Sequence, residues 1–116
     1  ILLMKGDNMK TLNDYCNDLC ERITKATHER WKHTRETTTH TYKVGQKYIK
    51  IITCENGNDR SVWGFINKSN PNFNEGDILK AAGWRTPALN KARGNIYDGY
   101  DIDPNSMRIY GPDYLR

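Results

Sequence analysis

The residues best suited to chemistry lie in a basic segment of twenty residues from Ile78 to Tyr97, which contains no acidic residue. An arginine guanidinium binds phosphate through paired hydrogen bonds, and aromatic rings stack on bases or pack against a protein partner. Because Pro87 and Gly94 interrupt this segment, we expect a loop on a β scaffold, where binding groups are common. The candidate binding residues are its cations and aromatic side chains: Lys80, Trp84, Arg85, Lys91, Arg93 and Tyr97.

The sixteen residues that follow reverse the charge. They contain Asp98, Asp101, Asp103 and Asp113 against a single cation, Arg108. If this acidic run stays apart, the basic segment presents a positive surface to phosphates or to an acidic partner. If the two pair with each other, that surface is cancelled. The sequence leaves both alternatives open.

Four residues in the N-terminal third have the chemistry of zinc ligands: Cys16, Cys20, His28 and His33. The gap of seven residues between Cys20 and His28 is shorter than the roughly twelve of the common zinc-finger spacing. Cys16 also falls on an apolar helical stripe, where cysteine acts as a small hydrophobic residue. We therefore expect no metal and no other cofactor.

A catalytic arrangement is not visible in the sequence. His28, His33 and His40 precede the β region in which a pocket would form, and Cys54 lies beside Glu55 without a neighbouring histidine. A nucleophile needs a base and an orienting group, and no glycine-rich phosphate loop is present. These observations favour a binding protein over an enzyme.

Residues 11 to 31 have the pattern of an amphipathic helix. Thr11 and Asp14 resemble a capping box, with aspartate in place of the usual glutamate or glutamine. Apolar residues recur at spacings of three and four along the segment, which places them on one face. This stripe predicts either packing against the β domain or a homodimer seam, and its members include Leu12, Cys16, Leu19 and Ile23.

The sequence after the helix predicts a small β domain. Residues 32–41 are polar and read as a linker, although the threonines also suit an exposed edge strand. Strands are expected at 47–53, 60–67, 76–80 and 106–110, and Asn56-Gly57 marks a turn that we expect to be longer than two residues. The predicted fold is α+β: an N-terminal helix followed by a small antiparallel β-barrel or sandwich, SH3-like in type. The expected division is a disordered or tag-like segment at 1–10, helix and linker at 11–41, and a β domain at 42–116.

The composition limits the class of protein. The 116 residues carry a net charge of +4 with a pI near 9.0, which is compatible with nucleic-acid binding without requiring it. Three cysteines, an odd number, favour a reducing cytoplasm over a disulfide scaffold. No stretch approaches the roughly 20 apolar residues that span a bilayer, so we expect no membrane partner.

The β region resembles small tailed-bacteriophage proteins. The similar motifs fall within residues 42–115: YKVGQKY at 42–48, WGFI at 63–66, GDILKAAGW at 76–84 and NKARGNI at 90–96. No activity is attached to that resemblance, so it assigns no functional residue. It implies a setting in the cytoplasm of an infected bacterium, where small phage proteins bind host machinery.

The leading hypothesis is a non-enzymatic binding module that engages a host protein or nucleoprotein complex through the basic, aromatic-flanked loop. The alternative is a protein that binds DNA or RNA directly through the same loop. Salt dependence separates the two, because phosphate contacts weaken steeply as salt rises whereas an apolar interface weakens less.

Overall fold

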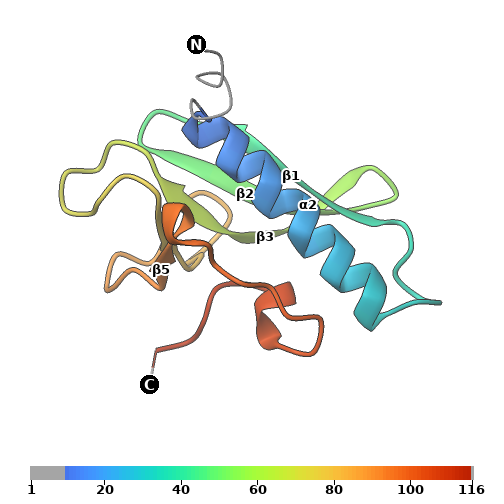
Figure 1. Ribbon diagram of the computed structural model, residues 1–116. Helices are drawn as coiled ribbons and strands as arrows, with labels where there is room; N and C mark the ends of the chain where they lie inside the picture. The colour runs from blue at the N-terminus through green and yellow to red at the C-terminus, as the bar shows by residue number, and fades with distance from the viewer. Residues whose placement is uncertain (1–9, 116) are drawn as a thin grey trace, which may run out of the picture.

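The computed structural model describes residues 10–115, and within them the helix α2 (Leu12–Arg30) precedes the sheet (Figure 1). The predicted capping box begins the helix: the Asp14 backbone N–H donates to Thr11 Oγ1 over 3.2 Å, and the Thr11 N–H donates to Asp14 Oδ2 over 2.9 Å. The predicted helix is confirmed to within one residue at each end. The expectation of a disordered or tag-like start falls almost wholly on residues 1–9, which lie outside the described part.

The strands form one antiparallel sheet in the order β1-β2-β3-β4-β5. Their bounds are β1 Thr38–Val44, β2 Tyr48–Glu55, β3 Asn58–Asn67, β4 Asp77–Leu79 and β5 Gly94–Asn95. Within residues 10–115, β1 and β5 are free edges of this single sheet, so it is neither a closed barrel nor a pair of stacked sheets. The α+β class is confirmed, and the barrel is wrong. Since β4 and β5 contain only three and two residues, they carry too little sheet to curl round to β1.

The structure differs from two other predictions about the strands. The segment expected as a last strand at 106–110 contains instead a 3-10 turn, η2 (Met107–Ile109), because Ser106 Oγ accepts the Arg108 N–H and caps it. The edge strand that the threonines allowed is real, since β1 begins at Thr38 inside the stretch read as a linker.

The β2–β3 connection is shorter than expected. Asn56 and Gly57 have φ of 52° and 80° and form a two-residue turn, because both accept the left-handed backbone that such a hairpin needs. Further along β3 a bulge interrupts the alternation: Ile51 pairs with Gly64 but Ile52 pairs with Val62. Trp63 is therefore the extra residue between the two pairs.

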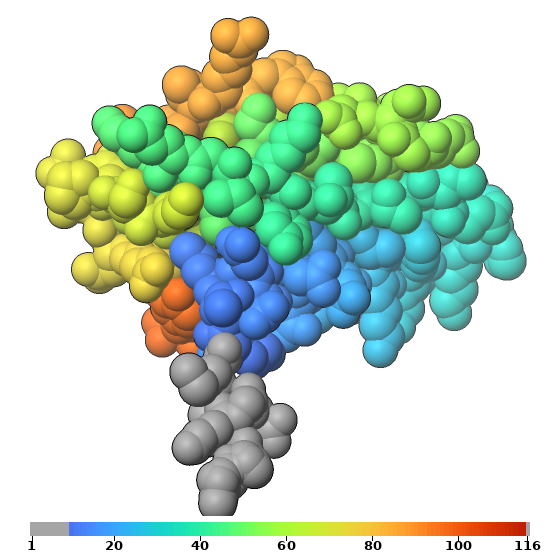
Figure 2. All heavy atoms as spheres, turned by 90° about the horizontal axis from the view of Figure 1, so that it is seen from above, coloured from blue at the N-terminus to red at the C-terminus, as the bar shows by residue number. Residues whose placement is uncertain are grey.

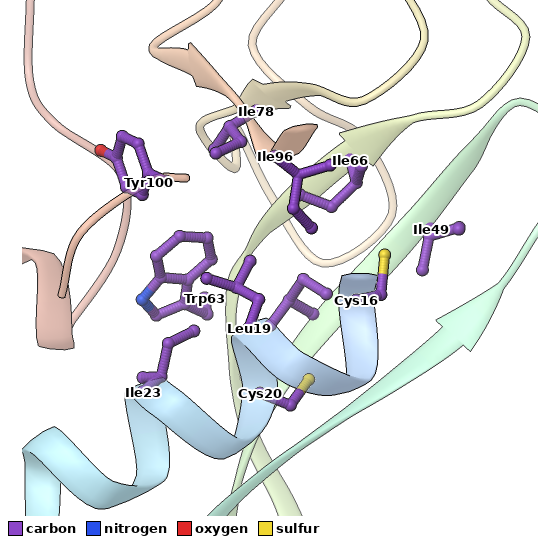
Figure 3. Packing of buried hydrophobic residues seen from close by; sticks show 11 residues of the cluster. Cys16, Leu19, Cys20, Ile23, Ile49, Trp63, Ile66, Ile78, Ile96 and Tyr100 are labelled. Carbon is purple, nitrogen blue, oxygen red and sulfur yellow. The ribbon is translucent and has the colours of Figure 1, made fainter. Parts of the chain in front are cut away.

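The core lies between α2 and one face of the sheet (Figure 3). Cys16, Leu19 and Ile23 are fully buried there, and Leu12 packs at the margin. The other members come mainly from the strands and the segment after β5: Cys20, Ile49, Ile51, Trp63, Ile66, Ile78, Ile96 and Tyr100. Of the two roles expected for the apolar stripe, packing on the β region is the one observed. Cys16, Leu19 and Ile23 are buried within the chain, and a homodimer through the helix stays a prediction.

The other face of the sheet carries a different row of residues. Lys43, Lys50, Phe65 and Leu79 are consecutive cross-strand partners in β1, β2, β3 and β4. Directly opposite residues share a face, and their neighbours along each strand point to the helix side. We call this the outer face. Figure 2 shows the sheet (green) between α2 (blue) and part of the segment that follows β4 (orange).

Candidate functional site

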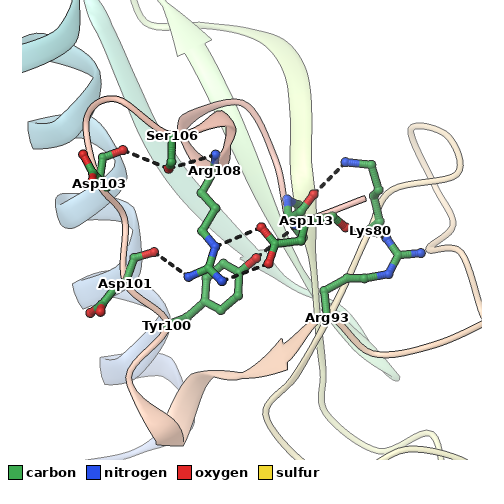
Figure 4. Close-up of polar contacts among 9 residues, drawn as sticks. Lys80, Arg93, Tyr100, Asp101, Asp103, Ser106, Arg108 and Asp113 are labelled. Carbon is green, nitrogen blue, oxygen red and sulfur yellow. Dashed lines mark hydrogen bonds and ion pairs between the residues drawn. The ribbon is translucent and has the colours of Figure 1, made fainter. Parts of the chain in front are cut away.

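The structure separates the six predicted binding residues into four places. Lys80 and Arg93 hold the C-terminal tail (Figure 4). Lys80 Nζ donates to Pro112 O over 2.7 Å and lies 3.8 Å from the ring centroid of Tyr114. Arg93 Nη1 donates to Asp113 O over 3.0 Å. Burial, with a smaller contribution from Arg93, lowers the pKa of Lys80. Both cations are therefore structural groups.

The acidic run does not neutralise these two cations by carboxylate pairing. Lys80 and Arg93 bind main-chain oxygens of the tail, while the Asp113 carboxylate pairs with Arg108 at 2.9 Å. Arg108 Nη1 also donates to Asp101 O over 2.9 Å. Arg108 is thus the cation that organises the acidic run. Two cations of the basic segment, Lys80 and Arg93, are therefore occupied by backbone carbonyls and not by carboxylates.

Tyr97 and Lys91 occupy two further positions. Tyr97 packs edge-on against Tyr15 of α2, with ring centroids 4.8 Å apart, so it belongs to the helix side of the molecule. Burial, with a smaller effect of Glu75, raises its pKa. Lys91 borders a hollow on the tail with Arg93 and Tyr114. Neither residue shares the surroundings of Trp84 or Arg85.

Trp84 and Arg85 lie over the outer face of the sheet. Arg85 lines a groove of about 340 Å³ with three lysines of the β1–β2 hairpin, Lys43, Lys47 and Lys50. Trp84 is 51% exposed, and Lys50 Nζ lies 6.0 Å from its ring centroid. We call this surface the basic groove; it comprises Lys43, Lys47, Lys50, Arg85, the aromatic lining residues Tyr48 and Phe65, and Trp84 beside them.

The charge of the basic groove is unbalanced. Lys43 and Lys50 are directly opposite each other in β1 and β2, an arrangement of like charges that destabilises a sheet. Among the described residues, those that line the groove include four cations and no carboxylate. A local arrangement that costs stability is expected where a binding function needs it.

The aromatic floor of the groove is held in place by packing and one hydrogen bond. Tyr48 and Phe65 pack edge to face with centroids 6.1 Å apart, and the Tyr48 hydroxyl accepts a hydrogen bond from Asn70 Nδ2 over 2.9 Å. Phe65 is almost fully buried, so it supports the groove from below. Trp84, in contrast, offers about half of its surface to a ligand.

Sequence reasoning missed the three lysines of the groove. A usable signal was present: the stretch from Tyr42 to Cys54 contains Lys43, Lys47 and Lys50 but no acidic residue. This signal was overlooked because the lysines alternate with β-forming residues, a pattern that by itself indicates only a strand. Their meeting with Arg85 depends on the loop after β4 returning across the sheet.

The match to known families covers most of the chain. Residues 3–103 match a family described as "Family of unknown function (DUF7717)". The chain belongs to this family. All charged residues of the basic groove fall inside the matched residues, whereas Arg108 and Asp113 of the tail lie beyond them. No curated protein and no solved structure is significantly similar to this DUF7717 member.

The zinc alternative finds no support in the geometry of this DUF7717 member. Burial raises the pKa of Cys16 and of Cys20 to about 12, which keeps both thiols protonated within the core. In residues 10–115 no cluster of three or more His, Cys, Asp or Glu side chains could hold a metal ion. Over the same residues, no helix has the length and apolar character needed to cross a membrane.

Proposed function

We propose that this protein binds single-stranded nucleic acid through the basic groove. The observation that carries the proposal is the convergence of Lys43, Lys47, Lys50 and Arg85 beside a half-exposed Trp84. Proteins that bind single strands combine a positive groove that follows the backbone with aromatic rings on which bases stack.

Each part of the groove has a role in this proposal. The three lysines neutralise phosphates and release their counterions, while Arg85 forks onto a phosphate or stacks beside a base. Trp84 provides the stacking platform, which requires an unpaired base and therefore favours a single strand over a duplex. Since none of these groups reads a base edge in a fixed geometry, binding is expected to tolerate sequence variation.

The test is fluorescence anisotropy with a labelled mixed-sequence single strand and the corresponding duplex, at about 50 mM and 200 mM salt. The informative variant is Lys43/Lys47/Lys50→Gln. Its matched control, Lys10/Lys25/Lys32→Gln, removes the same number of lysines from α2 and its flanks. Trp84→Leu tests stacking with no change of charge.

We expect the groove variant to weaken binding at least ~10-fold and to lower the salt slope by about 2, given about 0.7 per phosphate contact for single strands. The control should bind as the parent does. Trp84→Leu should cost about 1–3 kcal/mol of binding free energy. Equal losses in both triple variants, or no binding by the parent at low salt, would show the proposal to be wrong.

A second candidate function rests on the tail surface. Met107 and Tyr114 are 65% and 71% exposed and border a hollow with Lys91, Arg93 and Leu115. Exposed apolar side chains beside cations suit a protein partner with an acidic rim. This surface would serve a module that engages a host complex; the phage origin and cytoplasmic setting implied by the resemblance remain predictions. Met107→Ser with Tyr114→Ser should abolish capture of such a partner and leave nucleic-acid binding unchanged.

A further inference from the structure

A second polar site lies between the C-terminal half of α2, the sheet and η2. It is a hollow of about 80 Å³ bordered by residues from several segments of the chain. Those with chemistry that could bind a ligand are Arg35, His40, Thr53, Arg60, Ser61 and Tyr110. The charged residues of the basic groove contribute nothing to this hollow, so it is a separate feature of the fold.

Strand register gives the hollow a polar floor. His40 pairs with Thr53 across β1 and β2, and Thr53 pairs with Ser61 across β2 and β3. Directly opposite residues share a face, so the three side chains form one row. That row lies on the helix side, because His40 Nδ1 is 2.9 Å from Thr24 Oγ1 of α2. An imidazole and two hydroxyls thus lie on a face that elsewhere buries mainly hydrophobic side chains.

Two arginines and a tyrosine complete the border. Arg35 and Arg60 both reach the hollow, one from the turn before β1 and the other from β3. The Tyr110 hydroxyl accepts the Trp31 Nε1–H over 2.9 Å, which leaves its own proton to donate. The Thr37 and Thr38 hydroxyls donate hydrogen bonds to the Glu55 carboxylate and lower its pKa, and the charges of Arg60 and Arg35 lower it further. Glu55 itself does not border the hollow.

His40 adds a buried ring nitrogen without a hydrogen-bond partner. Within residues 10–115, its Nε2 is the one buried side-chain nitrogen or oxygen atom with no hydrogen-bond partner. Burial, with a smaller effect of His28, lowers the pKa of His40 to about 4, so the ring is neutral at pH 7. If the Thr24 hydroxyl donates to Nδ1, the single ring proton sits on Nε2. Nε2 is then an N–H group that calls for an acceptor.

We propose that this hollow binds a tetrahedral oxyanion, either inorganic phosphate or the terminal phosphate group of a larger molecule. The donors on its border, two guanidinium groups and several hydroxyls, suit phosphate oxygens, and the two positive charges disfavour a metal cation. The volume admits a few water molecules or one such anion, and it is too small for a base or a sugar.

The primary test is an NMR titration of the full chain with inorganic phosphate at pH 7, with chloride at matched ionic strength as the reference. We expect saturable shifts that share one Kd and centre on residues 35, 40, 53, 60, 61 and 110. A bound anion should also raise the pKa of His40, because it stabilises the imidazolium. Shifts that rise linearly without saturation, or that spread over all surface cations, would overturn the proposal.

Variants assign the binding to the hollow. Arg60→Gln and Arg35→Gln should each weaken phosphate binding at least ~10-fold, and Arg60→Lys should weaken it less, since it keeps the charge but loses the fork. Lys10→Gln removes an exposed cation near the start of α2, outside both the hollow and the basic groove, and serves as the control, with unchanged affinity. Arg60 is exposed, so its variants keep the test decisive if Arg35→Gln fails to fold. Equal affinity in the parent and both Arg60 variants would refute the site.

The source of the phosphate is decided by two oligonucleotides that differ only at the 5′ end. If the phosphorylated strand shifts the same six residues and the hydroxyl-ended strand does not, the site takes a terminal phosphate. If only inorganic phosphate shifts them, the site takes the free anion. Since Arg60→Gln leaves the basic groove intact, its effect is distinguishable from a failure of nucleic-acid binding there.

Discussion

Arg108 and Asp113 form a forked ion pair that folds the C-terminal tail back on the molecule. Arg108 Nε and Nη2 donate to Asp113 Oδ1 and Oδ2, each over 2.9 Å, and the guanidinium lies 3.9 Å from the ring centroid of Tyr100. The Asp113 backbone N–H donates to the Tyr100 hydroxyl over 3.0 Å. Through Tyr100, which belongs to the core, the tail is tied to the packed interior.

Arg108→Lys should loosen this tail. Lysine keeps the charge but cannot form the fork or stack as a plane on Tyr100, and we expect a loss of about 1 kcal/mol, because the pair is partly exposed. Hydrogen exchange should rise for residues 110–115 and stay unchanged in α2. Arg85→Lys, outside the pair, is the control. An unaltered exchange rate in the tail would mean that the fork does not fix it.

Gly64→Ala should destabilise the protein, whereas Gly83→Ala should be tolerated. An added Cβ at Gly64 would lie 2.9 Å from Pro112 Cγ and 3.0 Å from Leu79 O, so β4 or the tail must move. At Gly83 nothing lies within 4 Å. We expect a loss of about 1–3 kcal/mol at Gly64 from overpacking, measured by urea unfolding. Similar stability of the two variants would contradict the close approach of Pro112.

The cysteine thiols should be unreactive in the folded protein. Burial raises the pKa of Cys16 and of Cys20 to about 12, and it raises the pKa of Cys54 as well, with a smaller effect of Asp59. We expect labelling by a thiol reagent at pH 8 to be at least ~100-fold slower than in denaturant, because the thiolate is the nucleophile. In denaturant all three should react. Rapid labelling of Cys20 without denaturant would show that α2 leaves the sheet readily.

Stability should fall with acid because of His40. Its pKa lies below the ordinary 6.5, at about 4 in the folded state, so the folded protein resists protonation. The stabilisation is complete above about pH 6.5 and is lost as the pH falls toward 4, by up to about 3 kcal/mol at about 1.4 kcal/mol per pKa unit. The ionisable side chains that surround the ring are His28, Glu21 and Lys25 on one side and Arg35, Arg60 and Tyr110 on the other.

His40→Gln is the variant that tests this origin of the pH dependence. It should be less stable at pH 7 and should flatten the stability profile between pH 4 and 6.5, as followed by urea unfolding at each pH. His33→Gln, at an exposed position in the turn after α2, should leave the profile unchanged. A steep profile that survives in the His40 variant would assign the acid sensitivity to other groups.

The sequence alone determined the elements whose causes are local. Thr11 and Asp14 cap the helix because the bonds they make are three residues apart. The stripe through Leu19 and Ile23 follows from the helical repeat, and the strands on either side of Asn56-Gly57 follow from alternation and turn chemistry. The α+β class rests on these signals. The turn length was missed because sequence composition around it suggests a longer loop.

Only the tertiary structure decided which cationic side chains are available to bind a ligand. Lys80 and Arg93 look equivalent to Arg85 in the sequence, but in the structure they donate hydrogen bonds to main-chain oxygens of the C-terminal tail. Lys43 and Lys50 look like ordinary strand residues, yet register places them opposite each other and beside Arg85. In both cases the deciding contacts join residues far apart in the chain. Such contacts depend on the tertiary arrangement of the sheet and its loops, and a local sequence pattern does not determine that arrangement.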